Sequence, residues 1–521
     1  MTTPTPHPKP WPRTTWAALL AALTLCTLCV HGYHPLAEDG GLYVAGVQYK
    51  LDPSLFPHYT DFVREHLHFS VFAPTLDAAV RLTHLPLAWV LLLTEILSIW
   101  LTLFAARQIL RRAIPASDAA QLAGISLLAA WWTLPIAGTS LLLMDPYVTA
   151  RSLSTPLSLL AIAFALDENP SPGPLLRCTL CLLAAAAFHP LMAAYALAFI
   201  IVLLVSKLRR RTLGWTILAA VALTTAALLQ MITPPESPAL QAAAITRYYW
   251  FLSQWQWFER LGLLGPPAML SLLLIFRRHK LSNAATTLCN SCIALAAIAT
   301  LTALLFAHES APVHLIARLQ VLRVYLLIYA LMAMLLGATL YQLCNEAAQG
   351  SPSTLSRKTL RITPTLFLLT MAAIMAFVQR QTYTSSPEVE LPWRAAHNPN
   401  PWVQAFLWAK SNTPQDALFA LDAKYVNTDG EDAQTFRATS LRSALPDYSK
   451  DGGEASITPA LAPVWQPAAT VQKDLSQQPD AQRDAHLQPF AVTWMVLHST
   501  ALTVHPCPYD NGTVKVCRLI P

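Results

Sequence analysis

Long apolar runs separated by short polar connections fill the first three-quarters of the chain. A helix that crosses a bilayer needs roughly 20 mostly apolar residues. The pattern predicts about eleven crossings, in the runs 16–32, 85–106, 122–135, 152–166, 178–205 (two helices), 214–232, 263–276, 284–307, 319–343 and 363–377. The fold class expected from this pattern is an α-helical polytopic membrane protein.

The run 178–205 is too long for one crossing and short for two. His189-Pro190 lies in its middle, and proline breaks a helix at its own position. We therefore predict a pair of short helices that meet near His189. Irregular backbone at this depth is tolerated only where protein or water covers it.

Charge gives the predicted orientation. The dense clusters of Lys and Arg at 107–112, 207–211, 277–280 and 357–361 all fall on one predicted side, and such clusters mark cytoplasmic loops. Residues 1–15 are then a cytoplasmic tail, and 16–379 form the transmembrane domain. The first outer loop is 33–83.

Composition agrees with a membrane location. Only 12% of the residues are charged and 54% are hydrophobic, against about 25% charged in soluble proteins, and the mean hydropathy is +0.41. The net charge of +6 is small for this length. Membrane lipids are the expected surroundings, and no nucleic-acid partner is expected.

From about residue 380 the sequence becomes polar and rich in proline. A helix is predicted at Asn400–Lys410, and strands at Ala417–Leu421, Ala491–Leu497 and Val514–Ile520. The segment 380–521 is long enough for a core of its own. We expect a small extracytoplasmic α/β domain.

Cys507 and Cys517 flank an Asn511-Gly512 pair, which is a hairpin signal. A three-residue loop centred on Gly512 would place the two cysteines opposite each other, so a disulfide is predicted. A disulfide implies an oxidising compartment for the C-terminus. The other seven cysteines lie in or at the ends of apolar helices and are interpreted as packing residues.

The first outer loop carries the candidate chemistry. Glu38 and Asp39 are adjacent carboxylates where the chain leaves the first helix, and Gly40-Gly41 after them allows close backbone approach. A carboxylate here could act as general base on an acceptor hydroxyl or bind a divalent metal such as Mg²⁺ or Mn²⁺. The alternative is a solvated acid pair without a role.

Other residues of this loop could support the acid pair. An amphipathic helix at the membrane surface is predicted over Thr60–Leu82, and with Tyr43 and Tyr49 it would cover the acids. His34 is a candidate partner. The histidines of this region match no strong metal motif, and most are expected at the interface or in hydrogen bonds.

Three arginines, Arg247, Arg318 and Arg323, fall on the predicted outer side. Arg323 lies inside an apolar run, and an intramembrane charge indicates function. Guanidinium groups pair well with phosphate, so these residues are candidate phosphate ligands. The alternative is that they extend to the lipid headgroups. Arg151 is interpreted as a structural partner of Asp145.

The stretch Glu38-Asp39-Gly40-Gly41-Leu42-Tyr43 is similar to the acid-then-aromatic first-loop motif of the GT-C superfamily of membrane glycosyltransferases. Trp408-Ala409-Lys410-Ser411-Asn412-Thr413-Pro414-Gln415-Asp416-Ala417-Leu418-Phe419 resembles the helix–Asn-Thr-Pro–strand element that opens many of their soluble domains. The layout of the whole chain resembles this superfamily and bacterial membrane proteins of the same layout. The acids differ from a clean Asp-Glu pair, and no unmistakable donor-binding motif is present.

The resemblance implies an enzyme in a bacterial cell or inner membrane. It would move a sugar from a polyprenyl-phosphate donor to a lipid, glycan or protein acceptor on the outer face. Asp39 or Glu38 would be base or metal ligand, and Arg318, Arg323 and Arg247 would bind the donor phosphate. The alternatives are a transporter or flippase for a lipid-linked substrate and a non-catalytic protein with an outer interaction domain. The enzyme hypothesis requires a cleft joining the acids to Arg318 and Arg323.

Overall fold

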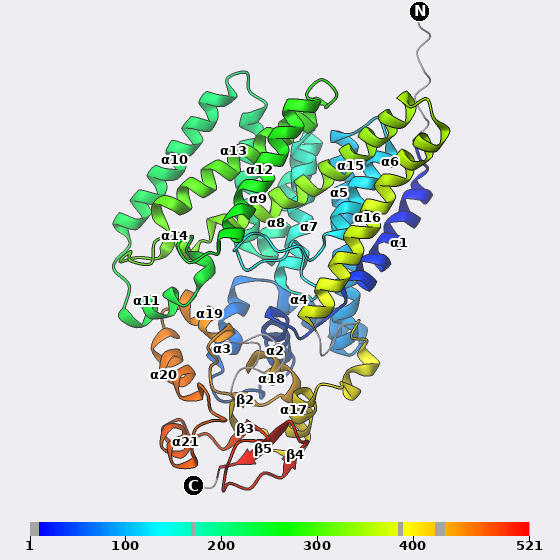
Figure 1. Ribbon diagram of the computed structural model, residues 1–521. Helices are drawn as coiled ribbons and strands as arrows, with labels where there is room; N and C mark the ends of the chain where they lie inside the picture. Colours follow the sequence, from blue (N-terminus) through cyan, green and yellow to red (C-terminus); the bar gives the residue numbers. More distant parts are fainter. Residues whose placement is uncertain (1–9, 168–171, 384–388, 422–432, 520–521) are drawn as a thin grey trace, which may run out of the picture.

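The computed structural model describes residues 10–167, 172–383, 389–421 and 433–519. Figure 1 shows a bundle of helices above a small sheet, with several short helices between them. Within the described ranges, seven helical segments are long and apolar enough to cross a membrane, and four further apolar helices are shorter. The prediction of a polytopic helical membrane protein with a small C-terminal sheet domain is confirmed.

The long apolar helices are α1 (Arg13–His31), α5 (Leu87–Ala113), α10 (Arg211–Ile232), α12 (Trp257–Arg277), α13 (Asn283–Phe306), α15 (Tyr325–Gly350) and α16 (Thr354–Thr382). The shorter apolar helices are α6 (Asp118–Ala130), α7 (Ala150–Ala165), α8 (Pro172–Phe188) and α9 (Pro190–Ser206).

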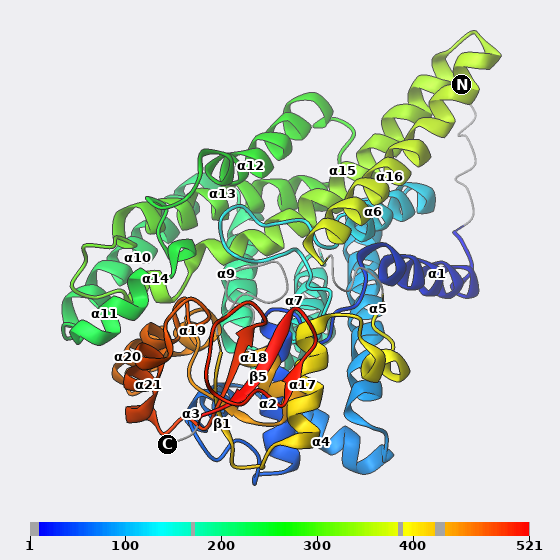
Figure 2. The same ribbon diagram turned by 60° about the horizontal axis from the view of Figure 1, so that its bottom comes forward.

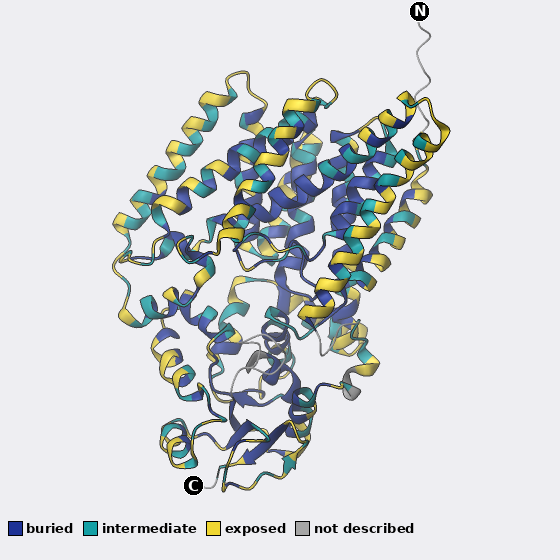
Figure 3. Ribbon diagram, viewed as in Figure 1, coloured by how far each residue is buried: buried dark blue, intermediate teal, exposed yellow. Residues whose placement is uncertain are grey.

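Burial separates the centre of the bundle from its rim. Most of α15 is buried, whereas α10 has one buried residue and α16 has three. Figure 3 shows the same contrast between the bundle centre and its outer helices. Large exposed side chains on the rim include Met231, Phe276 and Phe377. Exposed apolar surface on this scale is the kind that lipid covers.

The break predicted at His189-Pro190 is present. Helix α8 ends at Phe188, and α9 starts at Pro190 with His189 as its N-cap residue, whose ring accepts a hydrogen bond from the Met192 amide. Proline is tolerated at this first helical position, because the backbone N–H that proline lacks would have no hydrogen-bond acceptor within the helix.

The predicted helix 319–343 is wrong at its start. The chain instead forms α14 (Leu315–Arg318) and the 3-10 turn η3 (Val321–Val324) before α15 begins. Gln320 between them has a φ of 48°, a left-handed conformation that interrupts a helix. Arg323 therefore lies on an irregular segment at the end of the bundle.

The first loop joins the C-terminal sheet domain. It contains α2 (Asp39–Leu51), α3 (Asp61–Arg64), η1 (Glu65–Phe69) and α4 (Phe72–Thr83). The predicted single surface helix over Thr60–Leu82 is therefore wrong, because an extended residue, Ser70, separates η1 from α4. The Phe62 side chain is buried against Ala455 and Trp465 rather than facing a lipid surface.

Hydrogen bonds connect this loop to the sheet domain. Gln48 donates to the Ala438 carbonyl at 2.8 Å, and Thr435 donates to the Leu36 carbonyl at 3.0 Å. Three more short helices are α11 (Pro238–Ile245), η2 (Tyr248–Trp250) and η4 (Pro392–His397).

The C-terminal part forms a five-stranded sheet in the order β2-β1-β3-β5-β4. Its strands are β1 (Leu418–Leu421), β2 (Ser443–Ala444), β3 (Trp494–His498), β4 (Tyr509–Asp510) and β5 (Val514–Arg518). Its helices are α17 (Pro401–Asn412), α18 (Ala433–Ser440), α19 (Lys450–Ile457), α20 (Ala462–Gln472), α21 (Asp480–Leu487) and η5 (Gln488–Phe490). Strand β1 pairs in parallel with β2 and β3, while β3–β5 and β5–β4 are antiparallel.

Successive side chains of a strand point to opposite faces, which gives this sheet two cores. Phe419 and Val496 pack with Phe406 of α17. Leu418 and Met495 pack with residues from the other side. Figure 2 shows α17 on one side of the strands and α20 and α21 on the other.

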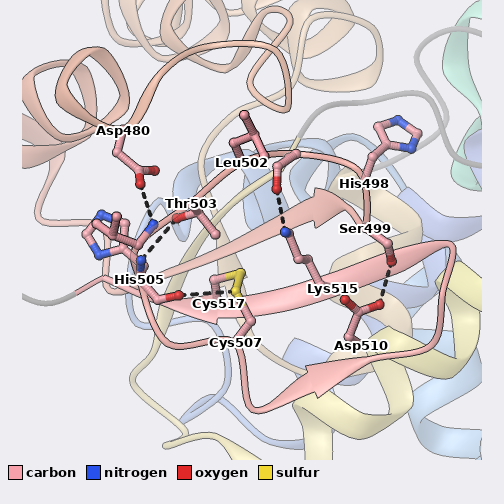
Figure 4. The surroundings of a disulfide bond; sticks show 12 residues. Asp480, His498, Ser499, Leu502, Thr503, His505, Cys507, Asp510, Lys515 and Cys517 are labelled. Atoms are coloured by element: carbon pink, nitrogen blue, oxygen red, sulfur yellow. Dashed lines mark hydrogen bonds between the residues drawn. A yellow bond between two sulfur atoms is a disulfide. The ribbon is translucent and has the colours of Figure 1, made fainter.

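The predicted disulfide between Cys507 and Cys517 is present. It links the segment before β4 to β5, and Gly512 in the hairpin turn has a φ of 83°. The predicted three-residue loop is wrong, because Asp510 pairs with Lys515 and not with Val514. Figure 4 shows the bridge beside the loop 499–506, where Ser499 donates a hydrogen bond to Asp510.

Candidate functional site

The acid pair lies at the start of α2, between the helix bundle and the sheet (Figure 1). Glu38 has a φ of 49° and a ψ of −127°, a strained conformation of the kind that clusters at functional sites. Gly40 approaches Pro35 so closely that a Cβ atom would lie 2.6 Å from the Pro35 oxygen. The close approach predicted for the glycine pair is thus present at Gly40.

Two cations from distant parts of the chain contact these carboxylates. The Lys450 ammonium of α19 forms an ion pair with Glu38 and lies 3.5 Å from Asp39 Oδ1. Arg151 of α7 donates from Nη1 to Asp39 Oδ2 at 3.2 Å. Each oxygen of Asp39 therefore faces a different cation.

Arg151 also binds a second carboxylate. It donates from Nη2 to Asp145 Oδ2 at 2.8 Å, which confirms the predicted pairing of these residues. Helix α7 starts with a capping box between Thr149 and Ser152, which orders its first turn. The turn aims the guanidinium of Arg151 between Asp145 and Asp39.

Asp39 is charged in this environment. Burial would raise its pKa, but Lys450, Arg151 and Arg323 together hold the pKa below its ordinary value. The side chains of Glu38 and Asp39 remain 31% and 33% exposed. A molecule arriving from solvent can therefore reach an ionised carboxylate.

Arg323 is the predicted arginine whose charge reaches the acid pair. Its guanidinium carbon lies 5.4 Å from the centre of the Tyr249 ring, and its charge acts on Asp39. A small cleft opens beside it, lined by Thr139, Tyr249, Trp250, Ala307, Ile316 and Gln320. The cleft reaches Arg323 but not Arg318, Glu38 or Asp39. It therefore does not itself join the acids to both arginines, as the enzyme hypothesis requires.

Arg247 and Arg318 bind the backbone around α19. Arg247 donates to the carbonyls of Tyr448 and Ser449, at 2.9 and 2.5 Å. Arg318 donates to the Ser456 carbonyl at 2.9 Å and also to Glu236. The two arginines thus hold the two ends of the helix that carries Lys450, while their role as phosphate ligands stays a prediction.

The two predicted supporting residues lie near the acids without binding them. The ring of His34 stacks on Tyr383 with centroids 4.1 Å apart, and burial lowers the pKa of His34 to about 4. Tyr43 packs edge-on against His66 and Phe72. Burial raises the pKa of Tyr43 above its ordinary value, so the phenol stays neutral.

The donor set does not fit a divalent metal. Mg²⁺ and Mn²⁺ favour several free oxygen ligands, but ammonium and guanidinium groups already contact the oxygens of Glu38 and Asp39. Throughout the described ranges, no group of three or more His, Cys, Asp or Glu side chains is placed to hold a metal ion.

Lys450 and the contact of Arg151 with Asp39 were not predicted from the sequence. Lys450 lies 412 positions from Glu38, in a polar stretch without a recognisable motif. The one local signal was a lysine within Asp447-Tyr448-Ser449-Lys450-Asp451. Only the docking of the sheet domain on the first loop brings this lysine to the acids.

The chain thus combines a bundle of apolar helices, an acid pair at the start of the first loop and a C-terminal sheet domain. No protein-family model and no curated protein sequence matches the chain. Among solved structures, this chain is similar to the archaeal oligosaccharyltransferase AglB of Archaeoglobus fulgidus, solved in complex with an inhibitory peptide and a dolichol-phosphate. The TM-score is 0.52 at 12% identity, over 94% of this chain and 70% of that one.

A second structure of the Archaeoglobus fulgidus oligosaccharyltransferase, tethered to an acceptor peptide by a disulfide, gives the same TM-score. Its identity is 10%, over 93% of this chain and 69% of that one. AglB is a GT-C membrane glycosyltransferase. The resemblance read from the acid motif and the chain layout is therefore confirmed at the level of the fold.

Proposed function

We propose that this protein is a GT-C-type glycosyltransferase that uses a polyprenyl-phosphate-linked sugar. The observation that carries the proposal is the Asp39 carboxylate, which is ionised, partly exposed and surrounded by Lys450, Arg151 and Arg323 where the apolar helices meet the sheet domain. The fold shared with a protein solved in complex with a dolichol-phosphate supports a donor of this chemical class.

The proposed step is a displacement at the anomeric carbon of the sugar. The bond from C1 to the phosphate oxygen breaks, and polyprenyl phosphate leaves with the electron pair. A hydroxyl or amide of the acceptor bonds to C1, and its proton passes to Asp39. Arg323 and Arg151 offset the charge that develops on the departing phosphate.

The lowered pKa of Asp39 determines at which stage of the reaction this carboxylate accepts the proton of the acceptor. A carboxylate held ionised by cations is a weak base, so it takes the proton only as the acceptor atom loses electrons to C1. Its role before that point is to accept a hydrogen bond from the acceptor and orient it.

We place this chemistry on the outer face of the membrane. The Cys507–Cys517 disulfide supports an oxidising compartment for the sheet domain. Arg112 at the end of α5 pairs with Asp167 after α7, and Arg277 at the end of α12 pairs with Glu346 of α15. These basic helix ends belong to the predicted cytoplasmic side.

The test is donor turnover in detergent. Wild type is given dolichyl- and undecaprenyl-phosphate-linked glucose, mannose and N-acetylglucosamine, labelled in the sugar, together with a panel of lipid, glycan and peptide acceptors, and release of label from the donor lipid is measured. Asp39→Asn should lower turnover at least about 100-fold, the scale of a lost general base, while donor binding remains. Glu38→Gln should lower it less.

Asp61→Asn is the matched control, because Asp61 lies in the same loop and forms an exposed pair with Arg64. It should keep wild-type turnover. Binding of a donor without release of label in wild type would contradict the enzyme and favour a transporter. Absence of binding to every donor would contradict both.

A further inference from the structure

Lys450 lies where a bridging cation would lie in the acid pair. Its ammonium contacts a carboxylate oxygen of Glu38 and is 3.5 Å from Asp39 Oδ1. Its side chain is only 14% exposed. A divalent ion shared by two adjacent carboxylates would have to occupy the same space.

The surrounding contacts hold the lysine in this position. Arg247 and Arg318 bind the backbone at the two ends of α19. Inside the sheet domain, Asp451 accepts a bond from Arg437 at 2.8 Å and another from the Asp447 amide. Lys450 therefore belongs to a helix that contacts hold at both ends. A lysine on a mobile surface segment would have no such fixed position.

Two further carboxylate oxygens also have a cationic partner. Asp39 Oδ2 accepts from Arg151, and Asp145 Oδ2 accepts from the same guanidinium at 2.8 Å. Adding a divalent ion would place two more positive charges beside two fixed cations. In a partly buried site this repulsion is screened much less than in water.

We infer that the Lys450 ammonium takes the place of a divalent metal at the acid pair, so that sugar transfer by this protein is independent of metal ions. Lys450 acts as a positioning residue: it neutralises Glu38 and fixes the orientation of Asp39. The inference rests on the proposed function, because it concerns the turnover of the same donor.

The first arm of the test uses wild type alone. Turnover of the active donor is measured after removal of metals with EDTA, and again with added Mg²⁺ or Mn²⁺. Equal turnover in all conditions supports the inference. Turnover lost in EDTA and restored by metal would overturn it while leaving the proposed function intact, and no turnover in any condition would contradict the proposed function itself.

The second arm exchanges the lysine. Lys450→Met should lower turnover in EDTA about tenfold or more, as expected for a lost charged contact, and Mn²⁺ should restore part of it because the space between the carboxylates is now free. A loss that Mn²⁺ does not restore, or no loss at all, would overturn the inference. A purely structural role would not create metal dependence.

Two further variants keep this arm interpretable. Lys450→Arg retains the charge and should keep most of the turnover in EDTA. Lys473→Met replaces an exposed lysine of the same domain and should change nothing. Unfolding temperatures of all variants show whether the fold survives, and the wild-type arm decides the question if Lys450→Met does not fold.

Discussion

At the scale of single residues, the geometry of the acid pair depends on the space left by Gly40. Its α-carbon packs on Pro35 and Tyr147, where a Cβ atom would lie 2.6 Å from the Pro35 oxygen and 3.3 Å from the Tyr147 Cβ. Backbone atoms cannot move aside as the end of a side chain can. This contact fixes the backbone position of Gly40 and thereby that of the two residues before it, Glu38 and Asp39.

Gly40→Ala should therefore lower the free energy of unfolding by about 1–3 kcal/mol, the usual effect of overpacking, and reduce turnover. Gly453→Ala is the control, because a Cβ atom there meets nothing within 4 Å and alanine favours the helix by up to about 1 kcal/mol. Thermal unfolding in detergent compares the two. Equal stability of both variants would contradict the close approach.

Glu454 gives the site a pH dependence. Burial, with Asp451, Asp39 and Glu65 nearby, raises its pKa from 4.5 to about 8. Between these values the folded protein holds a proton that the unfolded chain has released, so this group makes the fold less stable as the pH rises.

Glu454→Gln should remove this contribution, and the unfolding temperature should then fall less between pH 5 and pH 8 than in wild type. Asp416→Asn, at an exposed position of the same domain, should keep the wild-type slope. An unchanged slope in Glu454→Gln would mean that the carboxyl titrates normally.

At the scale of elements, α19 connects the two parts of the molecule. It carries Lys450 toward the acids and takes hydrogen bonds from Arg247 and Arg318 of the membrane part. An arginine that positions this helix and an arginine that binds donor phosphate differ in their kinetic effects. Loss of the first lowers kcat, and loss of the second raises KM for the donor.

Arg318→Ala should lower kcat about tenfold or more, the scale of a lost charged hydrogen bond, with little change in KM for the donor. Arg323→Ala should raise that KM and also lower kcat, because Arg323 lines a small cleft and its charge acts on Asp39. Steady-state kinetics with the labelled donor separate the two effects. A raised KM in Arg318→Ala would favour a phosphate contact instead.

Hydropathy and turn chemistry predicted most elements, because they depend on neighbours along the chain. The break at His189-Pro190, the strand Leu418–Leu421 and the hairpin at Gly512 follow from such local signals. The break at Gln320 was missed, since an apolar run such as Val321-Leu322 looks alike in a helix and in a turn. The placement of Arg323 inside a membrane helix failed for that reason.

At the scale of the whole molecule, the site is built from contacts that no local pattern encodes. The acids, Arg151, Arg323 and Lys450 come from four separate segments, and the docking of α18 and α19 on α2 decides which of them meet. The sequence identified the acids and one of the three cations by residue type. The other cations depended on tertiary packing.

Removing the disulfide tests whether turnover at the acid pair depends on the stability of the sheet domain. Replacing both Cys507 and Cys517 by alanine should destabilise that domain by about 2–3 kcal/mol, as expected for a closed loop of about 10 residues, because the bridge restricts the unfolded chain. Turnover at low temperature should be kept, since α19 is held by its own contacts.

Cys26→Ala is the comparison for this pair, because Cys26 is a free, exposed cysteine of α1. It should leave thermal unfolding unchanged. Loss of turnover in the double variant at a temperature where the sheet domain is still folded would show that the bridge shapes the site directly.

The position of Lys450 along the chain has a consequence for biosynthesis. The ribosome makes the acids first, then Arg151, then Arg323, and it reaches the lysine 412 positions after Glu38. During this time a chain already threaded into the membrane carries Glu38 without the partner it has in the folded protein. The site is therefore completed last. A chain cut short before α19 would have its helices in the bilayer, but its acid pair would lack Lys450.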